Sequence, residues 1–263
     1  MNDLNKKRPY AQEESITSLF FKDIPSIFPQ NEDEKISELE SPYLKLFSTV
    51  MSGSFYVLDF HKRCFHFVSE QDLFLSGYSF DDALKMGYDF FSKIVHPDDL
   101  QLFIDIHCAI LHYLSNPGDN PQEIDYFAFN IRFLHRGLSL MVYHKMIPFF
   151  LNGCARMAVC HLSDSVIHKS GNLEIYSENN KKYSSYSFAK CQWQEKKIIE
   201  LTNREKEILK LARQGKSNKE IADILHITEK TIRNFETILY PKLNVHSVYE
   251  AIIYATNHRM IFT

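Results

Sequence analysis

The residues with the clearest chemical pattern lie near the C-terminus, in the segment that follows Thr228. If Ile232, Phe235 and Leu239 face inward on a helix, the helical period turns a polar set outward. That set is Lys230, Arg233, Asn234 and Thr237. In the major groove of DNA, an arginine can bridge both acceptors of a guanine, and an asparagine can pair with an adenine. The outer face of this helix therefore predicts contacts with the base edges of double-stranded DNA.

A second set of side chains suits phosphate oxygens. Lys219, Lys230 and Thr231 lie near the starts of two predicted helices, where backbone amides also point outward. Such groups fix the register of a protein on DNA without reading its sequence. Thr228, the expected cap of the second of these helices, completes the predicted DNA-binding set.

The charge of the chain is divided in a way that agrees with this prediction. Residues 196–263 carry 12 Lys or Arg against 8 Asp or Glu, whereas residues 1–195 carry 18 against 25. A basic end attracts polyanions and an acidic first part is repelled by them. We therefore expect one part of the chain to bind DNA and the other to do something else.

Helices must position these side chains, and the sequence marks where each helix starts. Thr202 to Glu205 and Ser217 to Glu220 both match the reciprocal capping box, and Gly215 suits a left-handed stop. These signals predict four helices with one small shared core. Their ranges are 203–214, 218–225, 229–240 and 247–257.

The run from Leu201 to Val245 resembles the LuxR/GerE-type helix-turn-helix. The likeness rests on Leu-Thr-x-Arg-Glu at 201–205, Gly-x-Ser-Asn-Lys-Glu-Ile-Ala at 215–222, Thr-x-x-Thr at 228–231 and Lys-Leu at 242–243. It implies a four-helix domain whose third helix reads DNA and whose last helix commonly dimerises. By position, the family's DNA contacts fall on Thr231, Arg233, Asn234 and Thr237.

Two residues depart from the family pattern. Phe235 stands where the family usually has a histidine, and Pro241 is expected to stop or kink the third helix at Tyr240. In the last helix a stripe of small and apolar residues either seals the domain's own core or meets a twofold partner. The stripe is Val248, Ala251, Ile252 and Ala255. Since twofold DNA sites favour twofold proteins, we expect a homodimer on DNA.

Upstream, the pattern is that of an α+β domain: two strands, then helices, then three strands, which predicts a five-stranded antiparallel sheet with helices on one face. The expected strands are 55–60, 64–68, 127–133, 138–149 and 156–162. Short helical pieces are expected around 72–87, and a longer helix is expected from Pro97. The segment resembles a PAS domain, on Ser76-Gly77-Tyr78-Ser79 and Val95-His96-Pro97-Asp98-Asp99.

These predictions divide the chain into four parts. Residues 1–40 form a partly helical arm, with a helix near 34–47, and residues 41–165 form the PAS-like sensor or dimerisation domain. Residues 166–200 connect the domains, and within them 172–176 and 183–188 are expected to pair as a hairpin across 179–181. Residues 201–263 form the helix-turn-helix domain.

The PAS resemblance implies sensing or dimerisation and names no ligand, so a small molecule and a protein both remain candidate partners. The apolar face of Phe127, Phe129, Ile131 and Phe133 is expected to be filled core rather than a pocket. A haem on His107 or His112 is a weaker alternative. The sequence predicts no cofactor, no metal site and no catalytic group, because no nucleophile lies beside a base and the five cysteines are scattered.

The sequence thus predicts a one-component transcription regulator that binds double-stranded DNA. We expect it in the cytoplasm, because the chain has no apolar run long enough for a membrane span. The alternative is a protein-interaction adaptor whose helical module no longer binds DNA because Phe235 and Pro241 have altered the recognition helix.

Overall fold

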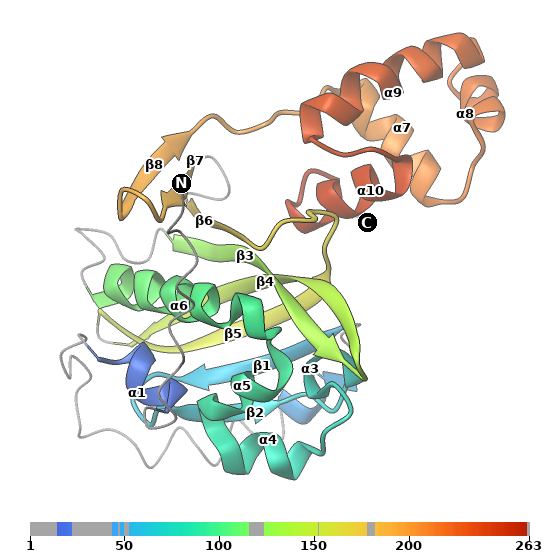
Figure 1. The fold of residues 1–263 in the computed structure, drawn as a ribbon. Coiled ribbons are helices and arrows are strands. Elements are labelled where there is room, and N and C mark those ends of the chain that lie inside the picture. Colours follow the sequence, from blue (N-terminus) through green and yellow to red (C-terminus); the bar gives the residue numbers. More distant parts are fainter. Residues whose placement is uncertain are drawn as a thin grey trace, which may run out of the picture.

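The structure, a computed structural model, describes residues 15–22, 44–46, 48–49, 53–115, 124–151, 153–177 and 182–261. One large sheet with helices packed on it is followed by a helical domain (Figure 1). The helices before the helical domain that are described from end to end are α1 (Ile16–Phe20), α3 (Asp72–Leu75), α4 (Phe80–Met86), η1 (Gly87–Phe90), α5 (Phe91–Ile94), η2 (Pro97–Asp99) and α6 (Leu100–Ser115). Most of the helix predicted near 34–47 lies outside the described residues. Within that range, residues 44–46 are described and are helical.

In the described part of the chain the sheet contains eight strands, so the predicted count of five is wrong. They are β1 (Ser54–Asp59), β2 (Cys64–Val68), β3 (Ile124–His135), β4 (Leu138–Leu151), β5 (Cys154–Asp164), β6 (Gly171–Ser177), β7 (Lys182–Ser187) and β8 (Gln192–Lys196). Their order is β2-β1-β5-β4-β3-β6-β7-β8. β1 to β5 are the five predicted strands, and β6 with β7 is the predicted hairpin. The hairpin does not stand apart as a connector, because β6 pairs with β3 and β8 adds a further strand beside β7.

The inner face of the sheet forms a dry aromatic core against α6. Phe127, Phe129, Ile131 and Phe133 have no exposed surface, as expected of filled core. Phe129 lies over His144, with ring centroids 4.6 Å apart, and Phe103 of α6 packs above it. Large buried rings of this kind give the domain most of its stabilising apolar area.

The outer face of β3 is also buried, although the alternating pattern predicts a half-buried strand. Tyr126, Ala128 and Asn130 are at most 1% exposed. Neighbouring strands cover part of this face, because Tyr176 of β6 stacks on Tyr126 and the Lys145 ammonium of β4 lies over the same ring. The C-terminal domain adds Arg259, whose guanidinium lies 5.8 Å from the centre of that ring. A period of two shows which side chains share a face, but it does not show what covers that face.

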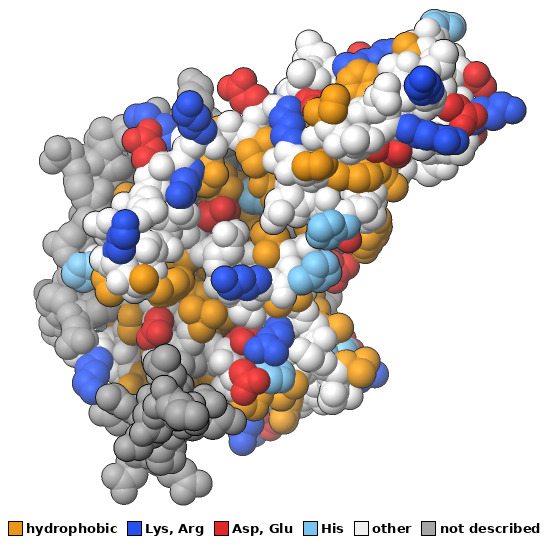
Figure 2. Space-filling model, turned by 45° about the horizontal axis from the view of Figure 1, so that its top comes forward, with side chains coloured by type: hydrophobic (Ala, Val, Ile, Leu, Met, Phe, Trp, Pro, Cys, Tyr) orange, Lys and Arg blue, Asp and Glu red, His pale blue; other side chains and the backbone are white. Residues whose placement is uncertain are grey.

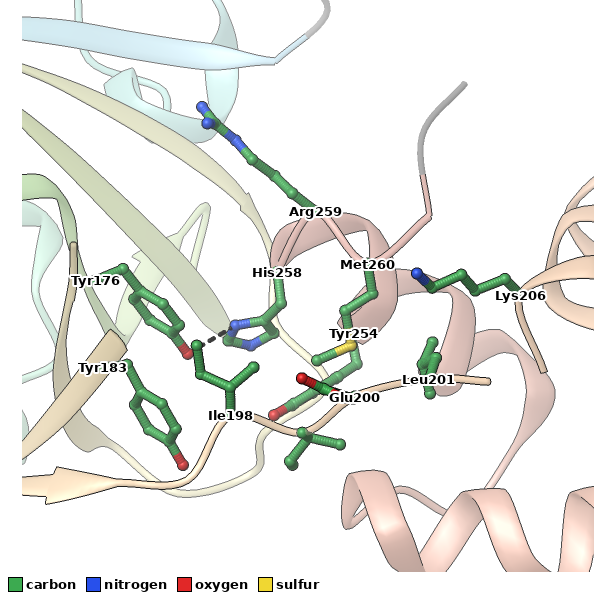
Figure 3. A pocket seen from close by; sticks show the side chains of 11 residues that line it. Tyr176, Tyr183, Ile198, Glu200, Leu201, Lys206, Tyr254, His258, Arg259 and Met260 are labelled. Carbon is green, nitrogen blue, oxygen red and sulfur yellow. Dashed lines mark hydrogen bonds between the residues drawn. The ribbon is translucent and has the colours of Figure 1, made fainter. Parts of the chain in front are cut away.

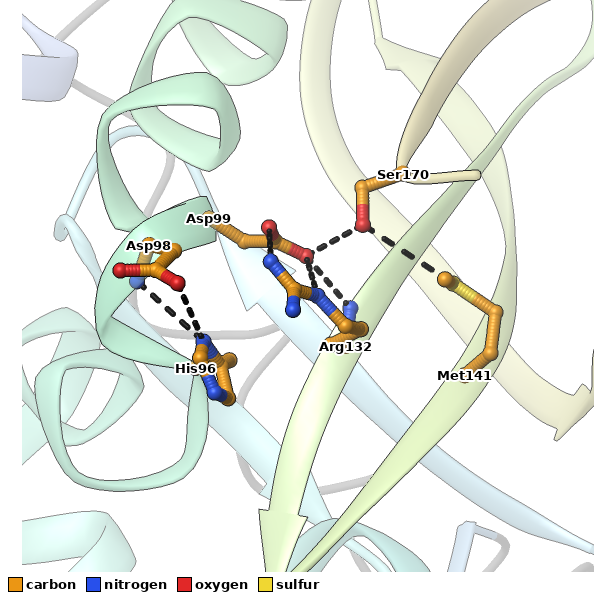
Figure 4. A network of polar contacts seen from close by, with 6 residues as sticks. All are labelled: His96, Asp98, Asp99, Arg132, Met141 and Ser170. Carbon is orange, nitrogen blue, oxygen red and sulfur yellow. Dashed lines mark hydrogen bonds and ion pairs between the residues drawn. The ribbon is translucent and has the colours of Figure 1, made fainter. Parts of the chain in front are cut away.

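The start of α6 is fixed by a polar network (Figure 4). Pro97 occupies the first turn as predicted, but Asp99 does more than face the helix dipole. Its carboxylate accepts from the Arg132 Nε at 3.0 Å and from the Ser170 hydroxyl, which joins α6 to β3 and to the segment before β6. Burial raises the pKa of Asp99, but the hydrogen bonds from Arg132 and Ser170 outweigh it and lower the pKa.

The C-terminal domain has the four predicted helices. They are α7 (Asn203–Arg213), α8 (Asn218–Ile224), α9 (Glu229–Leu243) and α10 (Val248–Asn257). Both capping boxes form, and Gly215 adopts φ +80° as expected of the left-handed stop.

Two details of the helical domain differ from the predictions. α9 continues through Pro241 to Leu243 instead of ending at Tyr240. Proline removes only one helical N–H, and the buried side chain of Leu243 holds the last turn in the core. The core itself is two clusters rather than one. One gathers around Ile221 and Ile232, and the other gathers around Leu209 and Leu239 and includes Val166 from the segment after β5.

The helical domain projects beyond the sheet domain, with α10 nearest the sheet and α8 and α9 farther out (Figure 1). On the face seen in Figure 2, the projecting lobe carries Lys and Arg side chains interspersed with Asp and Glu. Among the described residues, no helix combines the length and the hydropathy needed to cross a bilayer.

Candidate nucleic-acid interface

The helix pair α8 and α9 is held at its turn by short-range contacts. Thr228 caps α9 by accepting from the backbone N–H of Thr231 at 3.2 Å, and His226 takes a left-handed φ of +52° in the turn. The guanidinium of Arg204 on α7 donates to the carbonyl of Leu225 at 2.8 Å, which fixes the end of α8. The turn is therefore tied to the rest of the domain.

The inward face of α9 is apolar and buried. Ile232 and Leu239 are buried, and Phe235 is partly buried against the cluster of Ile221 and Ile232. Phe235 therefore packs on the core side of α9, together with the other residues of the predicted inward face. The outward face consequently carries only the polar residues of the helix and Ile238.

The predicted DNA-binding residues lie on the surface. Thr231 is partly exposed and the other members are exposed, namely Lys219, Thr228, Lys230, Arg233, Asn234 and Thr237. Those on α9 follow one side of the helix at helical spacing, as predicted. The apolar Ile238, 64% exposed, lies beside Thr237 and is a surface feature that the sequence reading missed.

The side chain of Arg233 pairs with an acidic residue on the same helix. Its side chain is 71% exposed, and its terminal nitrogen lies 3.3 Å from the carboxylate of Glu229 one turn earlier. An exposed pair of this kind contributes at most about 1 kcal/mol, so the guanidinium can exchange this partner for another acceptor.

All three hydroxyls of the predicted set already have partners. The Thr228 and Thr231 hydroxyls are 2.9 Å apart, and the Thr237 hydroxyl donates to the carbonyl of Arg233 at 2.9 Å. These bonds fix the side-chain directions and leave oxygen lone pairs or methyl groups facing solvent. Lys219, Lys230 and Asn234 have no hydrogen-bond partner among the described residues.

An ion pair and a hydrogen bond behind the surface link the helices. Lys242 of α9 donates to Glu205 of α7 at 2.9 Å, and the Asn218 amide of α8 donates to Glu236 of α9 at 3.1 Å. Burial raises the pKa of Glu205, but Lys242 and Thr202 together lower it below its ordinary value. The sequence marks Glu205 as part of a capping box and Lys242 as part of the family motif, but it did not predict that they pair across 37 positions.

The predicted dimerisation stripe is divided by the fold. Ala251 and Ala255 have no exposed surface and seal the domain's own core. Val248 is 38% exposed and Ile252 is partly buried, and the neighbouring Tyr249 is 61% exposed. The core reading is therefore correct for Ala251 and Ala255, and a twofold contact stays a prediction for the exposed part of the stripe.

The geometry agrees with a comparison of the sequence with protein families. The family described as bacterial regulatory proteins, luxR family, matches residues 200–255. The C-terminal domain is a LuxR-family helix-turn-helix. Since the match starts just before α7 and ends at Ala255, within α10, it covers nearly all of the LuxR-type domain and none of the sheet.

Curated relatives match the same part of the chain. The Fimbriae Z protein of Escherichia coli K12 is 40% identical over 72 residues, which cover 27% of this chain and 34% of that protein. The response regulator protein VraR of Staphylococcus aureus is 46% identical over 61 residues, which cover 23% and 29%. The chain thus spans about a third of the length of these relatives.

Solved structures match over a longer stretch but loosely. A structure of the Vibrio cholerae VqmA dimer without target DNA is 16% identical, covers 84% of this chain and 89% of that chain, and has a TM-score of 0.34. A structure of VqmA bound to DPO has a TM-score of 0.33.

The sequence reading missed the joint through which the LuxR-type domain meets the sheet. The Tyr176 hydroxyl on β6 and His258 Nδ1 after α10 are 2.9 Å apart, and Asn257 contacts Ser163 and Asp164 of β5. The Lys145 ammonium lies 3.7 Å from the centre of the Tyr126 ring. In the sequence this region looks like an ordinary helix end. It does not mark the joint, because the partners are far apart in the sequence.

Burial shapes the titration of this joint. It raises the pKa of Glu174, which accepts from the Tyr176 hydroxyl at 3.0 Å, to about 7. Burial also lowers the pKa of His258 to about 3 and that of Lys145 to about 7. His258 is therefore neutral at pH 7.

Proposed function

We propose that this chain is a transcription regulator that binds promoter DNA by placing α9 in the major groove. The observation that carries the proposal is the exposed polar face of α9. α9 lies on the side of the helical domain that is farther from the sheet (Figure 1). Arg233 and Asn234 read base edges. The DNA backbone and nearby bases are contacted by the other members of the set, namely Lys219, Lys230, Thr228, Thr231 and Thr237.

The chain contains a second exposed arginine that resembles Arg233 and serves as its control. Arg136 lies in the β3–β4 turn, is 68% exposed and pairs with Asp72 at 2.9 Å. Both arginines are equally exposed and each has one acidic partner, but only Arg233 belongs to α9. They differ mainly in location, which makes Arg136→Ala the control for Arg233→Ala.

Mobility-shift titration with genomic fragments tests the proposal. Arg233→Ala is expected to weaken specific binding by about 1 to 3 kcal/mol and to relax preference at one base pair. Arg136→Ala should leave both unchanged. Wild-type affinity should fall steeply between about 50 and about 200 mM salt, because phosphate contacts release counterions.

The same titration discriminates the adaptor alternative. An adaptor whose module no longer binds DNA shows no salt-sensitive shift at any salt concentration, and Arg233→Ala then changes nothing. Retained wild-type affinity and selectivity in Arg233→Ala would refute the assignment of that residue alone.

We further propose that the regulator acts as a homodimer in the cytoplasm. The exposed side of α10, with Val248, Tyr249 and Ile252, would form the contact, while Ala251 and Ala255 keep the helix in place from behind. Val248→Asp should weaken DNA binding and shift the sedimentation of the protein–DNA complex to that of a monomer. Unchanged sedimentation would place the dimer contact elsewhere.

We propose that the PAS-like sheet domain receives the signal directly, without a kinase partner. Its inner core holds His144 and His107, both buried, with both nitrogens of His144 and the Nε2 of His107 lacking a hydrogen-bond partner. Unpaired buried nitrogens favour a small molecule with hydrogen-bonding groups over a protein partner. Because the core around them is filled, such a molecule reaches these nitrogens only when the core opens on binding. Mass spectrometry of the native protein tests for such a molecule, and His144→Phe should abolish its retention.

A further inference from the structure

A cavity of about 370 Å³ opens at the joint between the two domains (Figure 3). Tyr176 and Tyr183 line it from the sheet, residues 198–200 from the connector, and Lys206 and Tyr254 from the LuxR-type domain. Cavities at domain joints of this size are common sites for small ligands. A molecule bound here would touch both domains at once.

The walls of the cavity suit a flat ring. Tyr176 and Tyr183 are stacked with their ring centroids 5.3 Å apart, and Ile198 and Met260 add aliphatic surface. Aromatic pairs favour further rings in offset or edge contact. The apolar part of the ligand is therefore aromatic.

The polar groups of the cavity suit a ligand that carries both charges. Glu200 and Lys206 both line it, yet neither forms an ion pair with the other or with any residue of the described ranges. The hydroxyls of Tyr183 and Tyr254 likewise have no hydrogen-bond partner there. Arg259, which also lines the cavity, extends its guanidinium away from Lys206 in Figure 3 and lies 5.8 Å from the centre of the Tyr126 ring.

We propose that this joint cavity binds a small zwitterion of the amino-acid type with an aromatic side chain. Lys206 receives the carboxylate, Glu200 receives the ammonium group, and the tyrosines surround the ring. The bound molecule links the sheet to α7 and α10 and so stabilises the docked arrangement of the two domains. The site is separate from the α9 face and from the inner core of the sheet.

Three probes with the same ring and different charges test the proposal by calorimetry on the full chain. They are L-phenylalanine, phenethylamine, which lacks the carboxylate, and 3-phenylpropanoate, which lacks the ammonium group. L-phenylalanine is expected to bind most tightly. Lys206→Met should weaken L-phenylalanine about tenfold and leave phenethylamine unchanged, whereas Glu200→Gln should weaken L-phenylalanine about tenfold and leave 3-phenylpropanoate unchanged.

Matched controls keep the test decisive. Lys210→Met removes an exposed lysine one turn further along α7, and Glu195→Gln removes an exposed carboxylate on β8, and both should bind L-phenylalanine like the wild type. The proposal is overturned if the wild type binds none of the three probes, or if each variant weakens all probes alike. The calorimetric test contains no DNA, so its result is independent of DNA binding. If none of the probes binds while the mobility shift of the wild type is normal, this inference is overturned and the proposed function stands.

Discussion

The two domains of this chain are stabilised in different ways. The sheet domain depends on residues far apart in the sequence, such as Phe103, Phe129 and His144, whose rings meet in one dry core. The LuxR-type domain depends more on neighbours in the sequence. Ser217 caps α8 by accepting from the backbone N–H of Glu220, three residues ahead, and Thr228 caps α9 in the same way through Thr231. The sheet domain is therefore fixed by non-local packing, whereas the LuxR-type domain is fixed in large part by local hydrogen bonds.

The largest effect should come from opening the aromatic core. Phe129→Ala is expected to lower the free energy of unfolding by about 3 to 5 kcal/mol, because the ring is lost and a cavity remains. Phe149→Ala on the next strand is the control, since Phe149 is 52% exposed and should cost far less. Urea unfolding followed by the fluorescence of Trp193 on β8 measures both. Equal losses would show that the core is not the main support of the sheet.

Acid should also act on the non-local core. Burial lowers the pKa of His107 from 6.5 to about 4, so between these values the unfolded chain binds a proton that the folded chain does not. The folded state therefore loses stability as the pH falls from about 6.5 to about 4, by about 3 kcal/mol from this residue.

The variant His107→Phe isolates that contribution. Phenylalanine keeps the stacking on Phe20, whose ring centroid lies 4.5 Å from that of His107, and does not titrate. Compared with the wild type, the variant should gain about 3 kcal/mol in relative stability between pH 6.5 and pH 4. Measuring the difference also cancels Glu174, whose raised pKa of about 7 acts in the opposite direction. Parallel pH curves for the two proteins would contradict the prediction.

The joint between the domains should give an intermediate effect. Tyr176→Phe leaves Glu174 and His258 without their shared hydroxyl, at a cost of about 1 to 3 kcal/mol in the stability of the docked state. Hydrogen exchange of the backbone amides of residues 258–261 should rise. Tyr183→Phe is the control, because its hydroxyl has no partner among the described residues while its ring also stacks. Equal exchange in both variants would mean that the hydroxyl of Tyr176 does not hold the joint.

The same contrast decides how much the sequence could predict. The helix caps, the stop at Gly215 and the helical spacing are each formed by residues a few positions apart. The helices of the LuxR-type domain and the exposed face of α9 were therefore predicted correctly. The extension of α9 through Pro241 was not, because the buried Leu243 that holds its last turn acts through tertiary packing. β8 and the pairing of β6 with β3 were missed for the same reason. The joint around Tyr176 and His258 joins positions 82 apart, and no local pattern marks it.

The smallest effect should come from removing one local cap. Ser217→Ala deletes the hydroxyl that accepts from the Glu220 N–H at 3.3 Å and should cost about 1 kcal/mol. Ser217→Thr keeps the oxygen and should behave like the wild type. Thermal unfolding measured by circular dichroism at 222 nm, where helices dominate the signal, is sensitive to this domain.

The size of this loss decides whether the contrast between the domains holds. If the LuxR-type domain is stabilised by several independent local bonds, each cap is worth about the same and their losses add. Ser217→Ala combined with Thr228→Ala should then cost about 2 kcal/mol. A double loss as large as that of Phe129→Ala would mean that the caps are coupled through the small cores around Ile232 and Leu239, and that this domain too is fixed by non-local packing.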